Sequence, residues 1–200
     1  MDEETNSDLN GLILAGGLSS RMGCDKSKIV YNNKPQYQTL YDLLKKNCSE
    51  VFLSQKKEEQ TLPKSLLCIV DQFEIRSPLI GILSAFQYDG SKAWLTVPCD
   101  MPLIDQALIT FLILHRDKEK VATCFWDSDK KYPEPLFTIW EQKADFLLKA
   151  YFKRGNFSPR EFLIHQDIKI IDTPDIHKLV NINTPIELTH FLSQPFGINQ

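Results

Sequence analysis

The chain has 200 residues, of which 42% are hydrophobic, enough to build one substantial core without stabilising disulfides or metals. Its 23 Lys and Arg residues nearly balance 26 Asp and Glu residues, which argues against a dedicated nucleic-acid or membrane-surface binder. No apolar run approaches the ~20 residues that span a bilayer, and neither a secretory signal nor a closely spaced cysteine pair for metal binding is visible. We therefore expect a cytoplasmic protein with reduced cysteines and no nucleic-acid or membrane partner.

The first half of the chain alternates between short apolar runs and stretches of helical spacing. Residues 1–10 are acidic and polar and are expected to form a flexible lead-in, followed by one domain over 11–200. Buried strands are predicted at 11–15, 51–53, 66–70 and 93–97. Helices are predicted between them at 36–47 and 78–88, with Pro78 suited to a first helical turn. Because parallel strands need crossover connections, this alternation predicts a mostly parallel sheet with helices on both faces.

The second half continues the alternation and adds a hairpin. The further elements are predicted as a helix at 105–115, a strand at 121–126, a turn at 127–131, a return strand at 136–139, helices at 140–152 and 159–165, and a strand at 168–171. A last helix begins after Thr184, which has the spacing of a capping box with Glu187. The predicted fold class is α/β, a single Rossmann-like three-layer domain with a mostly parallel sheet and a small antiparallel insertion.

The loop after the first predicted strand has the composition of a triphosphate site. Residues 14–26 contain three glycines, two serines, Arg21 and Lys26. Glycines let backbone N–H groups approach phosphate oxygens closely, and the two cations can neutralise an incoming polyanion. The spacing is neither that of a P-loop nor that of a dinucleotide-binding turn, which disfavours Walker-type hydrolysis and hydride transfer. A purely structural turn is the alternative.

Two aspartates follow predicted strands at the edge where open α/β sheets bind their ligands. Asp100 comes just after the strand at 93–97 and is the candidate ligand for Mg²⁺, which takes one or two carboxylates plus phosphates and water. Its alternative role is to cap the next helix. Asp71 follows the strand at 66–70, where it could meet the sugar or base of a nucleotide or serve as an ordinary turn residue.

Asn181 and Asn183 lie two residues apart in an extended stretch before the last helix, so both amides are expected on one side. They could bind a ligand, and Asx turns before a helix explain such residues equally well.

These segments together resemble the MobA family of molybdenum cofactor guanylyltransferases, within the nucleotidyltransferase superfamily. The stretch 14–26 is similar to the signature LAGGxSxRMGxDK. Further similar segments are YNNKP at 31–35, SPLIGI at 77–82, PCDMP at 98–102, EPLF at 134–137 and NINTP at 181–185. The resemblance covers nearly the whole chain.

The resemblance implies transfer of GMP from GTP to the phosphate of molybdopterin, with pyrophosphate as the second product and Mg²⁺ as the cofactor. It implies a catalytic set of Lys26, Arg21 and Asp100, with Asp100 as the metal ligand. It implies a nucleotide-binding set of Leu14, Ala15, Gly16, Gly17, Lys26, Ser54, Asp71 and Asp100. It implies an acceptor-binding set of Gly81, Asn181 and Asn183.

The sequence departs from the family pattern at several positions. Ser77 and Ile80 stand where the family has glycine and alanine, which is expected to reshape the backbone approach to the acceptor. Ser54 stands where the family often has an asparagine that reads the base, which weakens the assignment of guanine. Phe157 replaces an arginine, for which Arg154 or Arg160 could substitute.

Two other functions stay open at this point. A related nucleotidyltransferase could use CTP or another acceptor, and a degenerate nucleotide-binding module could have lost turnover; the joint presence of Lys26 and Asp100 argues against the latter. The substrates implied by the resemblance are GTP and molybdopterin. A molybdoenzyme or a chaperone that takes over the product is expected by analogy only.

Overall fold

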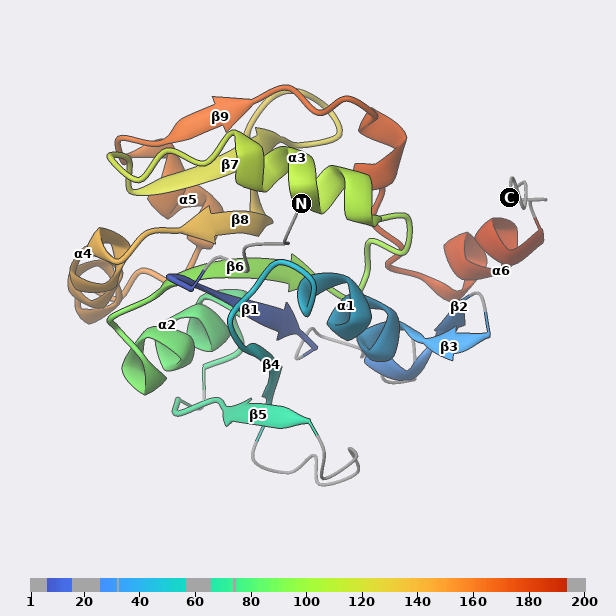
Figure 1. Ribbon diagram of the computed structural model, residues 1–200, viewed down its shortest axis with the longest axis horizontal. Helices are drawn as coiled ribbons and strands as arrows, with labels where there is room; N and C mark the ends of the chain where they lie inside the picture. Colours follow the sequence, from blue (N-terminus) through green and yellow to red (C-terminus); the bar gives the residue numbers. More distant parts are fainter. Residues whose placement is uncertain (1–6, 16–25, 32, 57–65, 74, 194–200) are drawn as a thin grey trace.

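One mixed sheet organises the molecule (Figure 1). The computed structural model describes residues 7–15, 26–31, 33–56, 66–73 and 75–193. The sheet has 7 strands in the order β5-β4-β1-β6-β8-β7-β9. These strands are β1 (Leu9–Leu14), β4 (Val51–Gln55), β5 (Leu67–Val70), β6 (Ala93–Pro98), β7 (Ala122–Trp126), β8 (Pro133–Trp140) and β9 (Lys169–Ile171). A separate hairpin joins β2 (Val30–Tyr31) to β3 (Lys34–Pro35).

Strand directions confirm the mostly parallel sheet and its antiparallel insertion. β1 pairs in parallel with β4 and with β6, and β4 pairs in parallel with β5. β8 runs antiparallel to both β6 and β7. The predicted turn at 127–131 closes the β7-β8 hairpin, where the Asp127 carboxylate accepts a hydrogen bond of 2.9 Å from the backbone N–H of Lys131.

The helices follow the predicted positions, with shifted ends. They are α1 (Gln36–Leu44), α2 (Pro78–Tyr88), α3 (Gln106–Leu114), α4 (Lys143–Lys153), α5 (Pro159–Ile164) and α6 (Pro185–Ser193). α2 has the predicted ends because Ser77 caps its first turn. α4 starts later than predicted because Trp140 still belongs to β8. β1 starts earlier than predicted and includes Leu9 and Asn10.

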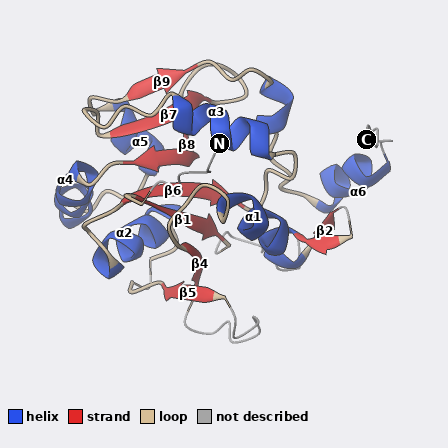
Figure 2. Cartoon of the chain, in the orientation of Figure 1, coloured by secondary structure: helices blue, strands red, loops and turns tan. Residues whose placement is uncertain are grey.

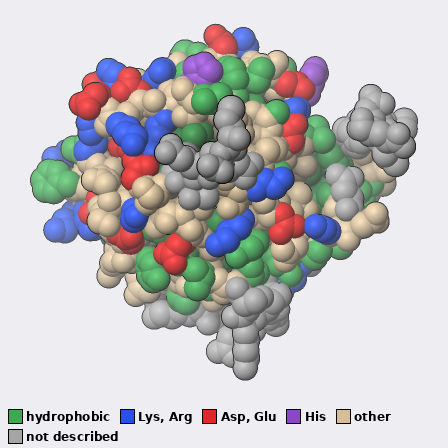
Figure 3. Space-filling model, in the orientation of Figure 1, with side chains coloured by type: hydrophobic (Ala, Val, Ile, Leu, Met, Phe, Trp, Pro, Cys, Tyr) green, Lys and Arg blue, Asp and Glu red, His purple; other side chains and the backbone are tan. Residues whose placement is uncertain are grey.

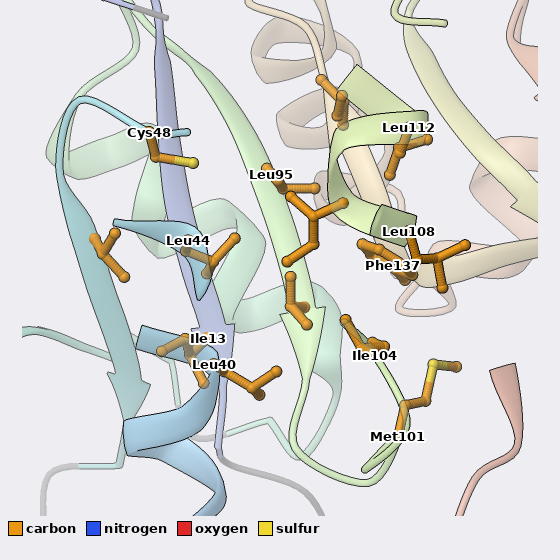
Figure 4. Close-up of a cluster of buried hydrophobic side chains, with 14 of the residues drawn as sticks. Ile13, Leu40, Leu44, Cys48, Leu95, Met101, Ile104, Leu108, Leu112 and Phe137 are labelled. Atoms are coloured by element: carbon orange, nitrogen blue, oxygen red, sulfur yellow. The ribbon is translucent and has the colours of Figure 1, made fainter. Parts of the chain in front are cut away.

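Helices cover both faces of the sheet (Figures 1 and 2). Alternating side chains of the central strands divide the core into two layers, one on each face. Ile13 of β1 belongs to a cluster with buried residues of α1 and α3. Figure 4 shows it next to Leu40 of α1, with Leu108 and Leu112 of α3 farther along the same cluster. The neighbouring Leu12 packs on the opposite face with residues of α2, α4 and α5. Two helical layers enclosing a sheet confirm the three-layer architecture.

Acidic and basic side chains are interspersed over the face drawn in Figure 3. Within the described ranges, no helix is both long and apolar enough to cross a bilayer.

Candidate nucleotide site

The carboxyl ends of β5, β4, β1 and β6 meet at one edge because these four strands are parallel. The chain moves outward from β1 to β4 and β5, then returns along α2 to β6 on the other side of β1. This reversal leaves a crevice outside the ends of β1 and β6, which is where open α/β sheets bind ligands.

A pocket lies at this edge. Its lining combines strand ends, the first turns of α2 and one residue of β8: Leu14, Ala15, Lys26, Ser54, Asp71, Ser77, Pro78, Gly81, Pro98, Cys99, Asp100 and Leu136. Seven of the residues proposed from the sequence therefore share one pocket: Leu14, Ala15, Lys26, Ser54, Asp71, Gly81 and Asp100.

Lys26 holds the charged end of the pocket together. Its ammonium Nζ lies 2.8 Å from the Asn183 side-chain oxygen and 3.4 Å from Oδ2 of Asp100. A backbone hydrogen bond of 2.8 Å, from Ile182 N–H to the Asp100 carbonyl, joins the same two segments. Three residues far apart in the chain thus place an ammonium group between two side-chain oxygen atoms. A positive charge held in this way is suited to phosphate binding.

The Asp100 carboxylate fits a divalent cation. Its Oδ1 is buried and has no hydrogen-bond partner among the described residues, while burial raises the pKa of the carboxyl and the nearby Lys26 charge lowers it. Such an oxygen can bind a metal ion, and Mg²⁺ accepts one carboxylate when phosphates and water supply its other ligands. In the described part of the chain no cluster of three or more His, Cys, Asp or Glu side chains could hold a metal alone. The alternative prediction, that Asp100 caps the next helix, is wrong, because Asp105 caps α3.

Ser54 and Asp71 form the opposite side of the pocket. The Ser54 hydroxyl donates a hydrogen bond of 2.9 Å to Oδ1 of Asp71, and the Asp71 N–H donates to the Gln55 carbonyl at 2.8 Å. Gly81 of α2 faces this pair closely, since a Cβ built on it would lie 2.6 Å from the Ser54 hydroxyl oxygen. Glycine is therefore needed for α2 to approach β4.

The remaining sequence candidates lie elsewhere. Gly16, Gly17 and Arg21 are outside the described residues. Asn181 lines a different pocket, formed with residues of α6, whereas Asn183 contacts Lys26. The two amides are thus not brought together as their spacing suggested.

The residues at which the sequence departs from the family pattern lie in different places in the structure. Ile80 is fully buried in the core beside α2, whereas Ser77 lines the pocket. Arg160 lies 3.8 Å from the Asp127 carboxylate and faces the Tyr132 ring, so its guanidinium is directed to the β7-β8 turn. Arg154 ends α4 and is exposed. Neither arginine is among the described residues lining the pocket.

Two features of the site were missed at the sequence level. Leu136 lines the pocket from β8, and Glu134, which precedes it by two residues, is a buried carboxyl whose pKa burial raises to about 7. A charged residue inside the EPLF segment was the available signal. Its significance depended on β8 lying beside β6, which the sequence pattern did not specify.

Comparison with known proteins shows which family and which relatives the chain resembles. Residues 11–168 match the family model described as "MobA-like NTP transferase domain". A "Molybdenum cofactor biosynthesis bifunctional protein" from Synechocystis sp. is 36% identical over 179 residues, covering 88% of this chain. The chain spans about half of that relative's length, 52%.

Other relatives match at nearly full length. A "Molybdenum cofactor guanylyltransferase" from Vibrio vulnificus is 29% identical over 90% of this chain and 93% of its own length. Among solved structures, "Molybdopterin-guanine dinucleotide biosynthesis protein A" from Archaeoglobus fulgidus superimposes with a TM-score of 0.75 at 19% identity, covering 90% of this chain and 95% of its own. A nucleotidyl transferase from Methanothermobacter gives a TM-score of 0.71 at 15% identity, over 92% and 95% of the two chains. These structural matches establish the same fold.

Proposed function

Because this chain belongs to the MobA-like NTP transferase family, we propose that it is a molybdenum cofactor guanylyltransferase. It transfers GMP from GTP to the terminal phosphate of molybdenum-loaded molybdopterin and releases pyrophosphate. The observation that carries the proposal is the Lys26 ammonium group between Asp100 and Asn183, at the carboxyl edge of the sheet. Relatives named as guanylyltransferases that match at nearly full length support the choice of reaction.

Binding and alignment are the main tasks of the protein in this reaction. A phosphate monoester has a second pKa of ~6, so the attacking oxygen is already ionised at neutral pH and needs no general base. The repulsion between two polyanions must instead be screened and the nucleophile held in line with the α-phosphorus. Lys26 supplies a fixed positive charge for the phosphates, and Asn183 holds its ammonium group in place.

Asp100 would hold Mg²⁺ through its buried Oδ1, while Oδ2 stays directed at Lys26. When bound, the ion supplies charge neutralisation at the phosphate oxygens. Asp71, held by Ser54 on the opposite side, would contact the nucleoside, which places sugar or base between β4, β5 and α2. The cytoplasm, where such phosphorylated substrates occur, is the proposed location.

A Gly81→Ala substitution tests the nucleotide side of the pocket. The new methyl group would meet the Ser54 hydroxyl oxygen and force it off Asp71. We expect the Kd for nucleotide to rise roughly tenfold, the effect of losing about one hydrogen bond. Isothermal titration calorimetry checks this. A Ser54→Ala variant should lose a similar amount, and equal nucleotide affinity in Gly81→Ala and wild type would contradict the placement of the nucleoside here.

The reaction itself is tested by incubating the purified protein with Mg²⁺, molybdenum-loaded molybdopterin and GTP, CTP, ATP or UTP in separate reactions. Mass spectrometry then follows the dinucleotide product, with pyrophosphate release measured in parallel. We expect product with GTP. Product with CTP alone would reassign the base. No product with any nucleotide would overturn the proposal. A molybdoenzyme or chaperone that receives the product is a further expectation.

A further inference from the structure

Phe157, in the segment between α4 and α5, is connected to two sides of the nucleotide pocket. It contacts Ser77 directly, and it reaches the segment after β5 through Phe152. Its backbone carbonyl accepts a hydrogen bond from the Ser77 hydroxyl. Its ring packs edge-on against Phe152 of α4, with ring centroids 5.5 Å apart and an interplanar angle of 71°. The two groups of one residue therefore act in different directions.

The carbonyl contact fixes the first turn of α2. The Ser77 oxygen also accepts a hydrogen bond of 3.1 Å from the backbone N–H of Leu79. A hydroxyl group has one proton to donate, so donation to Phe157 directs its lone pairs toward the helix N–H group. Ser77 and Pro78 line the pocket, and Gly81 faces Ser54 one turn later. The position of this whole rim thus depends on the orientation of the Ser77 side chain.

The ring contact extends to the other rim. Phe152 packs against Phe73 with ring centroids 4.7 Å apart. Phe73 comes two residues after Asp71, the carboxylate held by Ser54. Phe73 and Phe157 are 39% and 37% exposed, so burial in the core does not account for this aromatic row. Its three rings connect the segment after β5 to α4 and to Phe157.

We propose that Phe157 is a positioning residue for nucleotide binding, acting through Ser77 and through the Phe152–Phe73 pair. It holds the start of α2 and the segment carrying Asp71 at a fixed separation across the pocket. The structure brings Ser77 and Phe157 into direct contact, although they are 80 residues apart in the chain. The inference rests on the proposed function only in taking a nucleoside triphosphate as the ligand.

A double-mutant cycle tests the inference. Phe157→Ala, Ser77→Ala and the double variant are titrated with GTP and Mg²⁺ by calorimetry, and KM for GTP and kcat are measured alongside. We expect each single variant to raise Kd and KM roughly three- to tenfold, the effect of losing one aromatic contact or one hydrogen bond, with kcat changed less than about twofold. Because both changes loosen the same separation, between the start of α2 and the segment carrying Asp71, the double variant should lose less than the product of the two single effects.

Conservative variants separate positioning from general stability. Phe157→Tyr keeps the ring and Ser77→Thr keeps the hydroxyl, so both should restore nucleotide affinity to within about twofold of wild type. Phe146→Ala is the matched control, because Phe146 is a 76% exposed aromatic residue on the same helix as Phe152. It should leave Kd, KM and Tm unchanged.

Two results would overturn the inference. One is a Phe157→Ala variant that binds GTP as tightly as wild type; the other is a pair of single effects that multiply in the double variant. The first of these results includes a Phe157→Ala variant with a lower Tm and an unchanged Kd, since that is a structural effect alone. Failure of the proposed function is distinguishable, because it is a wild-type protein that binds nucleotide but forms no dinucleotide with molybdopterin.

Discussion

Replacing Lys26 by alanine should lower kcat/KM for guanylyl transfer by roughly 10²- to 10³-fold, the range found for loss of one preorganised charge contact in an active site. The side chain is the described cation in the pocket, and its Nζ lies between Asp100 and Asn183. Without it, the phosphates would face the Asp100 carboxylate directly. Steady-state kinetics with pyrophosphate release as the readout checks the change.

The structure provides a matched control for this substitution. Lys34 lies near α1, is 60% exposed at its side chain and pairs with Asp42 at 3.0 Å on the surface. Lys34→Ala removes the same charge at a distance from the pocket and should leave kcat/KM within about twofold of wild type, since surface pairs contribute little. Equal activities in Lys26→Ala and wild type, with circular dichroism showing both folded, would remove Lys26 from the mechanism.

A Glu134→Gln substitution should make stability less dependent on pH and raise it above neutrality. Glu134 is 4% exposed, and burial raises the pKa of its carboxyl to about 7 from 4.5, with Asp100 and Asp127 adding to the rise. Below pH 4.5 the carboxyl is protonated in both folded and unfolded chains. Between pH 4.5 and 7 only the unfolded chain ionises, so stability falls as pH rises, and above pH 7 the full cost of about 3 kcal/mol applies.

Urea denaturation at several pH values measures this effect. Glutamine keeps an oxygen for the backbone N–H of Leu136, which donates to Oε1 of Glu134 at 2.9 Å. The variant should therefore lose the decline between pH 5 and 7 and exceed wild type at pH 8 by up to about 3 kcal/mol. Glu119→Gln, at an exposed carboxylate, should keep the wild-type pH profile. A Glu134→Gln profile parallel to that of wild type would show that ionisation of Glu134 costs little.

Most of the fold could be predicted from the sequence because local signals and tertiary structure agree. α2 begins with a serine cap and a proline, and its predicted ends are those observed. The Thr184–Glu187 capping box forms at α6, with hydrogen bonds of 3.2 Å in both directions. Ends were misplaced where tertiary contacts decide them. β8 extends from Pro133 through Trp140, beyond the predicted 136–139, because it is paired along both of its edges.

Among the carboxylates of the candidate site, only those that follow a strand could be placed by reasoning from the strand pattern. Asp71 and Asp100 could be assigned to one edge because parallel strands end together there. Glu134 could not be assigned to this edge from the sequence, because it lies at the beginning of an antiparallel strand. The hydrophobic periodicity of a strand does not reveal which strands are its neighbours in the sheet. The separation of Asn181 from Asn183 likewise depends on how the chain bends before α6, which alternation along an ideal strand does not describe.

The contact between Lys26 and Asn183 spans 157 residues, and it joins the pocket to a segment that lies beyond the last strand of the sheet. That strand, β9, ends at Ile171. A chain truncated after residue 182 therefore keeps every described strand of the sheet while Lys26 lacks this partner. Once purified, the truncated chain should have a folded core and weak affinity for nucleotide, so that the truncation separates folding of the sheet from the ability to bind substrate.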